Sequence, residues 1–307
     1  MESLETPEAS AVVVVDAASV LLFLPWSLVT VVAFVSVVVD DCANMPAAVK
    51  SDTKMSLFMP FKRARNWPDL AVFIIVFCCA AQCAELHVAA AANLSNVLPV
   101  IATAFEAKSG VKVVPSYGAT AQLEQQIENG APYDVFLSAD TEHAAQLIKV
   151  GYALADSRFV YARGQLVVWA PQQPAIHSLR DLAAPGVRHI ALATPALAPY
   201  GSAAVDALKS AGLWEQVQPK VVYAPSIAVS KQYADTGNVE AAFTAYALTV
   251  NLNGHQFKVD EKLHKPIEQA AVIVKDSREM NIARRFMKFL AGREAHAIFT
   301  RFGYLQP

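Results

Sequence analysis

Four short turns in this sequence carry side chains whose main chemical capacity is hydrogen bonding. They read ANLSN from residue 92, SYGATAQ from residue 116, TPALAPYGS from residue 194 and YAPSIAVS from residue 223, and none contains lysine or arginine. Each turn leads into a stretch with helical spacing. The first N–H groups of a helix have no intrahelical acceptor, and the helix start carries about half a positive charge. Neutral donors of this kind can bind a compact anion, which is the chemistry that the turns predict.

A second interpretation of the same residues stays open. Asn, Ser and Thr at the start of a helix are also ordinary N-caps, each of which stabilises the helix by about 1 kcal/mol. A cap needs no ligand, so a single turn does not decide between the two roles. The repetition over four turns weakens the cap interpretation without removing it.

Short apolar runs alternate with helical stretches from residue 85 onward. We expect an α/β fold in which mainly parallel sheets are flanked by helices, because strand and helix alternate along the chain. In open parallel sheets ligands bind beyond the carboxyl ends of the strands, so the four turns should meet there. Strands are expected over residues 86–92, 111–115, 135–138, 165–170, 189–194, 220–223 and 241–245, and helices over 96–108, 121–129, 142–150, 203–211, 230–234 and 280–302, the last as a pair.

The region before residue 85 contains two apolar segments. Residues 17–39 carry no charge and are long enough to span a bilayer. The second segment, 70–80, follows a basic cluster at 62–65 and ends in small residues, an order typical of a secretory signal peptide.

Two interpretations of this region follow. Translation is expected to start at Met55 or Met59, so that residues 1–54 are an over-extended N-terminus and 55–84 a signal peptide cleaved near residue 84. Alternatively, residues 17–39 are a true membrane anchor. In either case the globular part should be exported to the periplasm.

Charge and cysteine content exclude several classes of function. The 25 basic and 27 acidic residues give a formal net charge of −2, which offers no footprint for a nucleic acid. All four cysteines precede the expected cleavage site, so the exported domain should hold no disulfide and no thiolate metal ligand. No metal or other cofactor is expected.

Several longer stretches resemble the periplasmic molybdate-binding proteins of ABC importers. They are AAAANLSN, SYGATAQLEQQIENGAPYDVFLSAD, TPALAPYGSAAVDAL, GNVEAAFTAY and the closing KFLAGREAHAIFTRFGY, and the similarity covers nearly all of residues 85–307. This resemblance implies a two-lobed periplasmic-binding-protein fold that holds a tetrahedral oxyanion in a cleft, without catalysis. It further implies molybdate or tungstate as ligand, ABC permease subunits as partners and a monomeric chain. Lobe 1 is expected over residues 85–165 and 270–307, and lobe 2 over 166–269, with the chain crossing near 163–166 and 266–272.

The resemblance also implies which residues hold the oxyanion. It assigns a backbone amide to Ala92 and to Ile227, a hydroxyl to Thr120, and further contacts to Asn93 and Tyr200, with no direct metal ligand. One position departs from the family: Ala245 stands where some members have a tyrosine, and Tyr246 follows it. We expect Tyr246 to be irrelevant and Tyr200 to replace the lost donor; the alternative is that the local alignment slips by one residue.

Three other functions remain as alternatives. They are a receptor for another tetrahedral oxyanion such as sulfate, the effector-binding domain of a transcription regulator, and an exported hydrolase. Against a hydrolase, the sequence contains no G-x-S-x-G elbow, and Ser202 is expected at the beginning of a helix. Since a carboxylate beside a dianion is repulsive, Asp134 and Asp140 are expected to be structural, the latter as a helix cap.

Overall fold

The structure, a computed structural model, describes residues 84–307. The chain divides into two units, Met1–Gln82 and Cys83–Pro307, and the described residues belong to the second unit. The expected start codon, signal peptide and apolar segment 17–39 lie outside the described residues. No helix within 84–307 has the length and apolar character needed to cross a bilayer.

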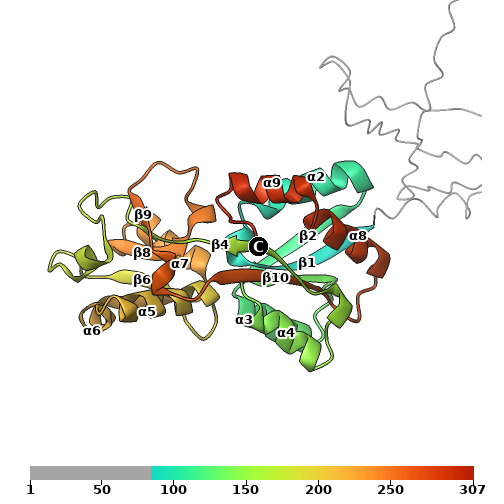
Figure 1. The fold of residues 1–307 in the computed structure, drawn as a ribbon, viewed down its shortest axis with the longest axis horizontal. Coiled ribbons are helices and arrows are strands. Elements are labelled where there is room, and N and C mark those ends of the chain that lie inside the picture. The colour runs from blue at the N-terminus through green and yellow to red at the C-terminus, as the bar shows by residue number, and fades with distance from the viewer. Residues whose placement is uncertain (1–83) are drawn as a thin grey trace, which may run out of the picture. The chain divides into compact units, whose positions relative to one another are not determined.

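The first of two five-stranded sheets has the strand order β2-β1-β3-β10-β4. β1 runs parallel to β2 and β3, whereas β10 runs antiparallel to β3 and β4. Figure 1 shows α2 and α9 over one face of this sheet and α3 and α4 over the other. The strands are β1 (Glu85–Ala91), β2 (Lys112–Gly118), β3 (Val135–Leu137), β4 (Phe159–Gly164) and β10 (Ile267–Ile273), and the helices are α2 (Leu98–Ser109), α3 (Thr120–Glu128), α4 (Glu142–Lys149), α8 (Met280–Leu290) and α9 (Arg293–Arg301).

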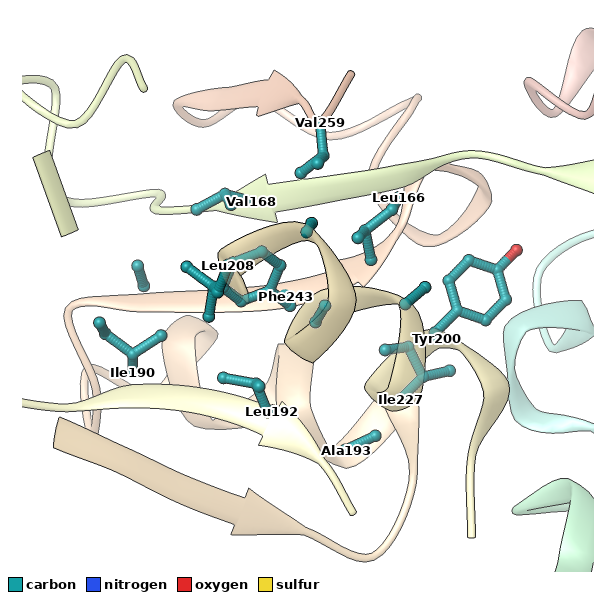
Figure 2. Packing of buried hydrophobic residues seen from close by; sticks show 14 of the residues in the cluster. Leu166, Val168, Ile190, Leu192, Ala193, Tyr200, Leu208, Ile227, Phe243 and Val259 are labelled. Atoms are coloured by element: carbon teal, nitrogen blue, oxygen red, sulfur yellow. The ribbon is translucent and has the colours of Figure 1, made fainter. Parts of the chain in front are cut away.

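The second sheet has the order β7-β6-β8-β5-β9. β6 runs parallel to β7 and β8, and β5 runs antiparallel to β8 and β9. Its core includes Leu192, Leu208 and Phe243, which interdigitate between the strands and α5 (Figure 2). The strands are β5 (Leu166–Trp169), β6 (Ile190–Ala193), β7 (Val221–Ala224), β8 (Ala241–Ala245) and β9 (Gln256–Lys258), and the helices are α5 (Pro199–Ser210), α6 (Trp214–Val217) and α7 (Ile227–Asp235).

The chain passes between the two sheets twice. On the way out only Gln165 separates β4 from β5, and on the way back residues 259–266 connect β9 to β10. β10 pairs with β4 from Ile267 onward, with a register shift between Gln269 and Ala270. This irregularity lies close to the point where the chain enters the first sheet.

The expected α/β fold and its seven strands are confirmed, but the sheets are mixed. The sequence pattern missed β4, β9 and β10, all of which pair antiparallel with their neighbours. Two helices begin earlier than expected: α5 at Pro199 and α7 at Ile227. Proline fits the first turn of a helix because its missing N–H would have had no intrahelical acceptor, which explains the earlier start of α5.

Candidate functional site

The four polar turns meet around one pocket of about 200 Å³, a volume that includes its open mouth. All five residues predicted to bind the ligand line it, and no lining residue is charged. The lining residues are Ala91, Ala92, Asn93, Gly118, Ala119, Thr120, Ala139, Ala198, Pro199, Tyr200 and Ile227. The structure thus brings together turns that are more than a hundred residues apart in the sequence.

Three helices begin at the pocket wall. Thr120 is the first residue of α3, Tyr200 the second of α5 and Ile227 the first of α7. The hydrogen bonds within residues 84–307 assign no acceptor to the backbone N–H of any of the three, nor to that of Ala92. Since each helix start also carries partial positive charge, the pocket presents several aimed dipoles.

Gly201 lets α5 reach this position. A Cβ at Gly201 would lie 2.1 Å from the carbonyl oxygen of Ala193, the last residue of β6. Only glycine therefore permits the first turn of α5 to lie directly against the end of the strand. The close approach brings the N–H of Tyr200 to the pocket.

The N-cap interpretation holds for one of the polar residues and not for two others. Ser226 caps α7, because its Oγ accepts the N–H of Val229 at 3.3 Å. The side chains of Thr120 and Asn93 cap no helix. The Thr120 hydroxyl receives only a long hydrogen bond, 3.4 Å, from the N–H of Ala139. Its own proton therefore remains available for another acceptor.

Asn93 lies in a short 3-10 turn, Ala92–Leu94, directly after β1, and is 1% exposed. Its Nδ2 donates to Gln269 Oε1 and to the hydroxyl of Tyr304, both at 2.9 Å. Its Oδ1 is buried and has no donor in the described chain. Neither Gln269 nor Tyr304 lines the pocket, so Nδ2 of the carboxamide points away from the pocket. Oδ1 is the end of the carboxamide without a hydrogen-bond partner, here called its free end.

The hydroxyl of Tyr200 is also engaged away from the pocket. It accepts a hydrogen bond from Gln269 Nε2 at 2.9 Å. It also lies so close to Gly164 that a Cβ there would come within 1.9 Å of the hydroxyl oxygen. Figure 2 shows the ring of Tyr200 extending beyond the core of the second sheet, beside Ile227. The donor that Tyr200 leaves free at the pocket wall is its backbone N–H.

Sequence reasoning missed three buried residues that form a hydrogen-bond network with Asn93 and Tyr200. Gln269, Tyr161 and Tyr304 are buried, and the Tyr161 hydroxyl lies 2.9 Å from Gln269 Oε1 and 3.0 Å from Ser138 O. Burial raises the pKa of all three network tyrosines, Tyr161, Tyr200 and Tyr304, so their hydroxyls stay protonated. The one available signal was a glutamine inside the otherwise apolar run of β10, since a buried amide needs partners.

Tyr246 and Ala245 do not line the pocket. The ring of Tyr246 lies against Gly303 and beneath Lys258, whose Nζ is 4.2 Å from the ring centre. Ala245 is buried in the core of the second sheet. That Tyr246 plays no part in ligand binding stays a prediction.

Asp134 and Asp140 have structural partners, as expected. Asp134 accepts the N–H of His87 and the hydroxyl of Ser277. Asp140 accepts the N–H of His143 in the first turn of α4, although the N-cap position of this helix is Thr141 and not Asp140. Although burial works to raise the pKa of Asp140, its hydrogen bonds and the charge of His143 hold that pKa below the usual value. Within residues 84–307 no group of three His, Cys, Asp or Glu side chains could hold a metal ion.

Comparison with known proteins places this chain in a family. Residues 86–305 match the model of the bacterial extracellular solute-binding proteins. The chain is 38% identical over 231 residues to the molybdate-binding protein ModA of Azotobacter vinelandii and 34% identical over 226 residues to ModA of Rhodobacter capsulatus. These alignments cover 74% and 73% of this chain and 92% and 90% of the relatives. The solved periplasmic molybdate-binding protein of A. vinelandii superposes with a TM-score of 0.70 at 36% identity, over 73% of this chain and all of that one. This chain therefore belongs to the bacterial extracellular solute-binding proteins, and within them to the ModA family.

Proposed function

We propose that this protein binds molybdate, or tungstate, which has nearly the same size, in the pocket and delivers it to an ABC importer. The observation that carries the proposal is the convergence of three helix starts, with unpaired N–H groups, on a pocket that no charged side chain lines. Members of a solute-binding family bind their solute without converting it, which removes the hydrolase alternative. The family is extracellular, in agreement with the predicted export signal.

The donor set can re-solvate a dianion without a cationic side chain. The candidate donors are the backbone N–H groups of Ala92, Thr120, Tyr200 and Ile227 and the hydroxyl of Thr120, with Asn93 as a further contact. A hydrogen bond with one charged partner contributes about 1.5–3 kcal/mol net. Five or six such bonds, less the cost of desolvation and of ordering the site, are compatible with submicromolar affinity.

The same donors give the pocket a preference among oxyanions. Hydrogen phosphate carries a hydroxyl that needs an acceptor, and no carboxylate lines the pocket. A fully ionised tetrahedral dianion needs donors only. Sulfate has the same charge and shape as molybdate but shorter bonds, so the pocket must discriminate between them by size.

Delivery to the importer would depend on closure of two lobes over the ligand. We assign lobe 1 to residues 85–165 and the C-terminal part of the chain, and lobe 2 to the residues between them. Because β10 pairs with β4 from Ile267 onward, we place the boundary at which the chain returns to lobe 1 before residue 267 and not at residue 270. The N–H of Ala121 donates to Leu197 O at 3.2 Å and so joins turns of the two lobes beside the pocket. A ligand held by donors from both lobes favours this closed form, which permease subunits would recognise.

Isothermal titration calorimetry of the purified protein with molybdate, tungstate, sulfate and phosphate tests the proposal. We expect submicromolar binding of the first two, sulfate binding at least about a hundredfold weaker, and no measurable binding of phosphate. Sulfate binding as tight as molybdate binding would identify a sulfate receptor instead.

A further inference from the structure

A buried network of amides and hydroxyls links the pocket to both sheets. Gln269, on β10, is fully buried and lies at its centre. Its Oε1 accepts from Asn93 Nδ2 and lies 2.9 Å from the hydroxyl of Tyr161, and its Nε2 donates to the hydroxyl of Tyr200. Gln269 therefore connects the two pocket residues Asn93 and Tyr200, which follow β1 of the first sheet and β6 of the second.

In this orientation of the amides, one buried oxygen lacks a donor and one buried hydroxyl proton lacks an acceptor. Asn93 Oδ1 has no donor. The hydroxyl oxygen of Tyr200 accepts a hydrogen bond from Gln269 Nε2, but the hydroxyl proton has no acceptor within residues 84–307. A buried polar group without a partner destabilises the folded state, so both groups require an explanation.

Rotating both amides by half a turn provides partners for these groups at unchanged distances, because an amide oxygen and an amide nitrogen are nearly equal in size. Gln269 Nε2 then donates to Asn93 Oδ1 and to Tyr161, which in turn donates to Ser138 O. The Tyr200 hydroxyl then donates to Gln269 Oε1. The free end of the Asn93 carboxamide becomes Nδ2, which carries two N–H donors.

We infer that Gln269 is a positioning residue of the oxyanion pocket, which in the ligand-bound protein holds Asn93 with Nδ2 presented to the ligand. The inference rests on the proposed function, because the ligand must supply the acceptor that Nδ2 then needs. A dianion offers only acceptors: it would repel Asn93 Oδ1 and attract Nδ2. Ligand binding therefore selects the orientation in which Asn93 Oδ1 and the Tyr200 hydroxyl both have partners. The Tyr304 hydroxyl, which loses its donor Nδ2 in that orientation, still donates to Asn93 O.

The first test is the variant Gln269→Met, which keeps the length of the side chain and removes its amide. Calorimetry with molybdate should show affinity lower by roughly ten- to a hundredfold, the effect of one misdirected charge-assisted hydrogen bond. Gln146→Met makes the same change at an exposed position of α4 and should bind as the unmodified protein does. Unchanged affinity in Gln269→Met would overturn the inference and leave the proposed function intact. Failure of the unmodified protein to bind molybdate would overturn both.

The second test uses the unmodified protein and therefore does not depend on whether Gln269→Met folds. Nuclear Overhauser contacts of the side-chain amide protons are measured in the ¹⁵N-labelled unmodified protein, with and without molybdate. In the molybdate-saturated protein the Gln269 amide protons should contact the ring of Tyr161 and not that of Tyr200. It should also shift the Asn93 amide resonances. Gln269 amide protons that stay beside Tyr200 in the bound state would refute the inference.

Discussion

The substitution Thr120→Val removes one hydroxyl from the pocket with little change in side-chain shape. Thr120 is 1% exposed, and its hydroxyl receives a single long hydrogen bond, from Ala139 N–H at 3.4 Å. If the hydroxyl donates to the dianion, its loss removes about 1.5–3 kcal/mol of binding free energy. Since 1.4 kcal/mol corresponds to tenfold, the dissociation constant for molybdate should rise by roughly ten- to a hundred-and-fifty-fold.

The free energy of unfolding without ligand should change much less. The lost hydrogen bond from Ala139 is near the limit of useful length, and a neutral hydrogen bond contributes only about 0.5–1.5 kcal/mol net. The methyl group that replaces the hydroxyl is buried, which offsets part of that loss. We therefore expect Thr120→Val to lower the unfolding free energy of the ligand-free protein by less than about 1 kcal/mol.

Calorimetry and denaturant unfolding with and without molybdate separate these two effects. At a molybdate concentration one hundred times its dissociation constant, the unmodified protein gains about 2.7 kcal/mol of stability, whereas a variant that binds thirtyfold more weakly gains about 0.9 kcal/mol. Thr103→Val, at an exposed position on α2, is the control and should leave both values unchanged. An unchanged dissociation constant in Thr120→Val would refute a role for this hydroxyl in binding.

Two further predictions concern the packing behind the pocket and one ion pair. Gly164→Ala would place a Cβ 1.9 Å from the hydroxyl oxygen of Tyr200 and should lower the unfolding free energy by about 1–3 kcal/mol, measured by denaturant unfolding. Gly186→Ala has open space and serves as control; equal stability of both variants would contradict the packing argument. Burial alone would lower the pKa of His143, but its hydrogen bond to Asp140 and nearby carboxylates raise that pKa overall. A pKa raised in the folded state means that protonated His143 stabilises the fold. This contribution should be complete below pH about 6.5, the ordinary pKa of histidine, and should disappear as the pH rises through the folded-state pKa. The difference in melting temperature between the unmodified protein and His143→Gln should therefore shrink as the pH rises. A difference that does not depend on pH would contradict a stabilising role for protonated His143.

Much of the site could be predicted from the sequence because its parts are local. A helix start is signalled by a few adjacent residues, and all five residues predicted to bind the ligand line the pocket. The family resemblance added which donors face the ligand, an assignment that stays a prediction. The misses were antiparallel strands such as β9 and β10. These strands are short or lie where the chain crosses between sheets, and their partners are distant in sequence, so no local period reveals them.

The sequence by itself determined that the pocket would be built from neutral donors. Alternation of apolar runs with helical stretches fixes the order of strands and helices, and the turns between them contain no cationic side chain. The tertiary structure decided which atoms of those residues remain free. Tyr200 and Asn93 direct their polar side-chain atoms to Gln269, far away in sequence, because a buried amide in β10 must find partners and the folded chain places these two within 2.9 Å. Such hydrogen bonds depend on three-dimensional proximity, which no spacing of residues along the chain encodes.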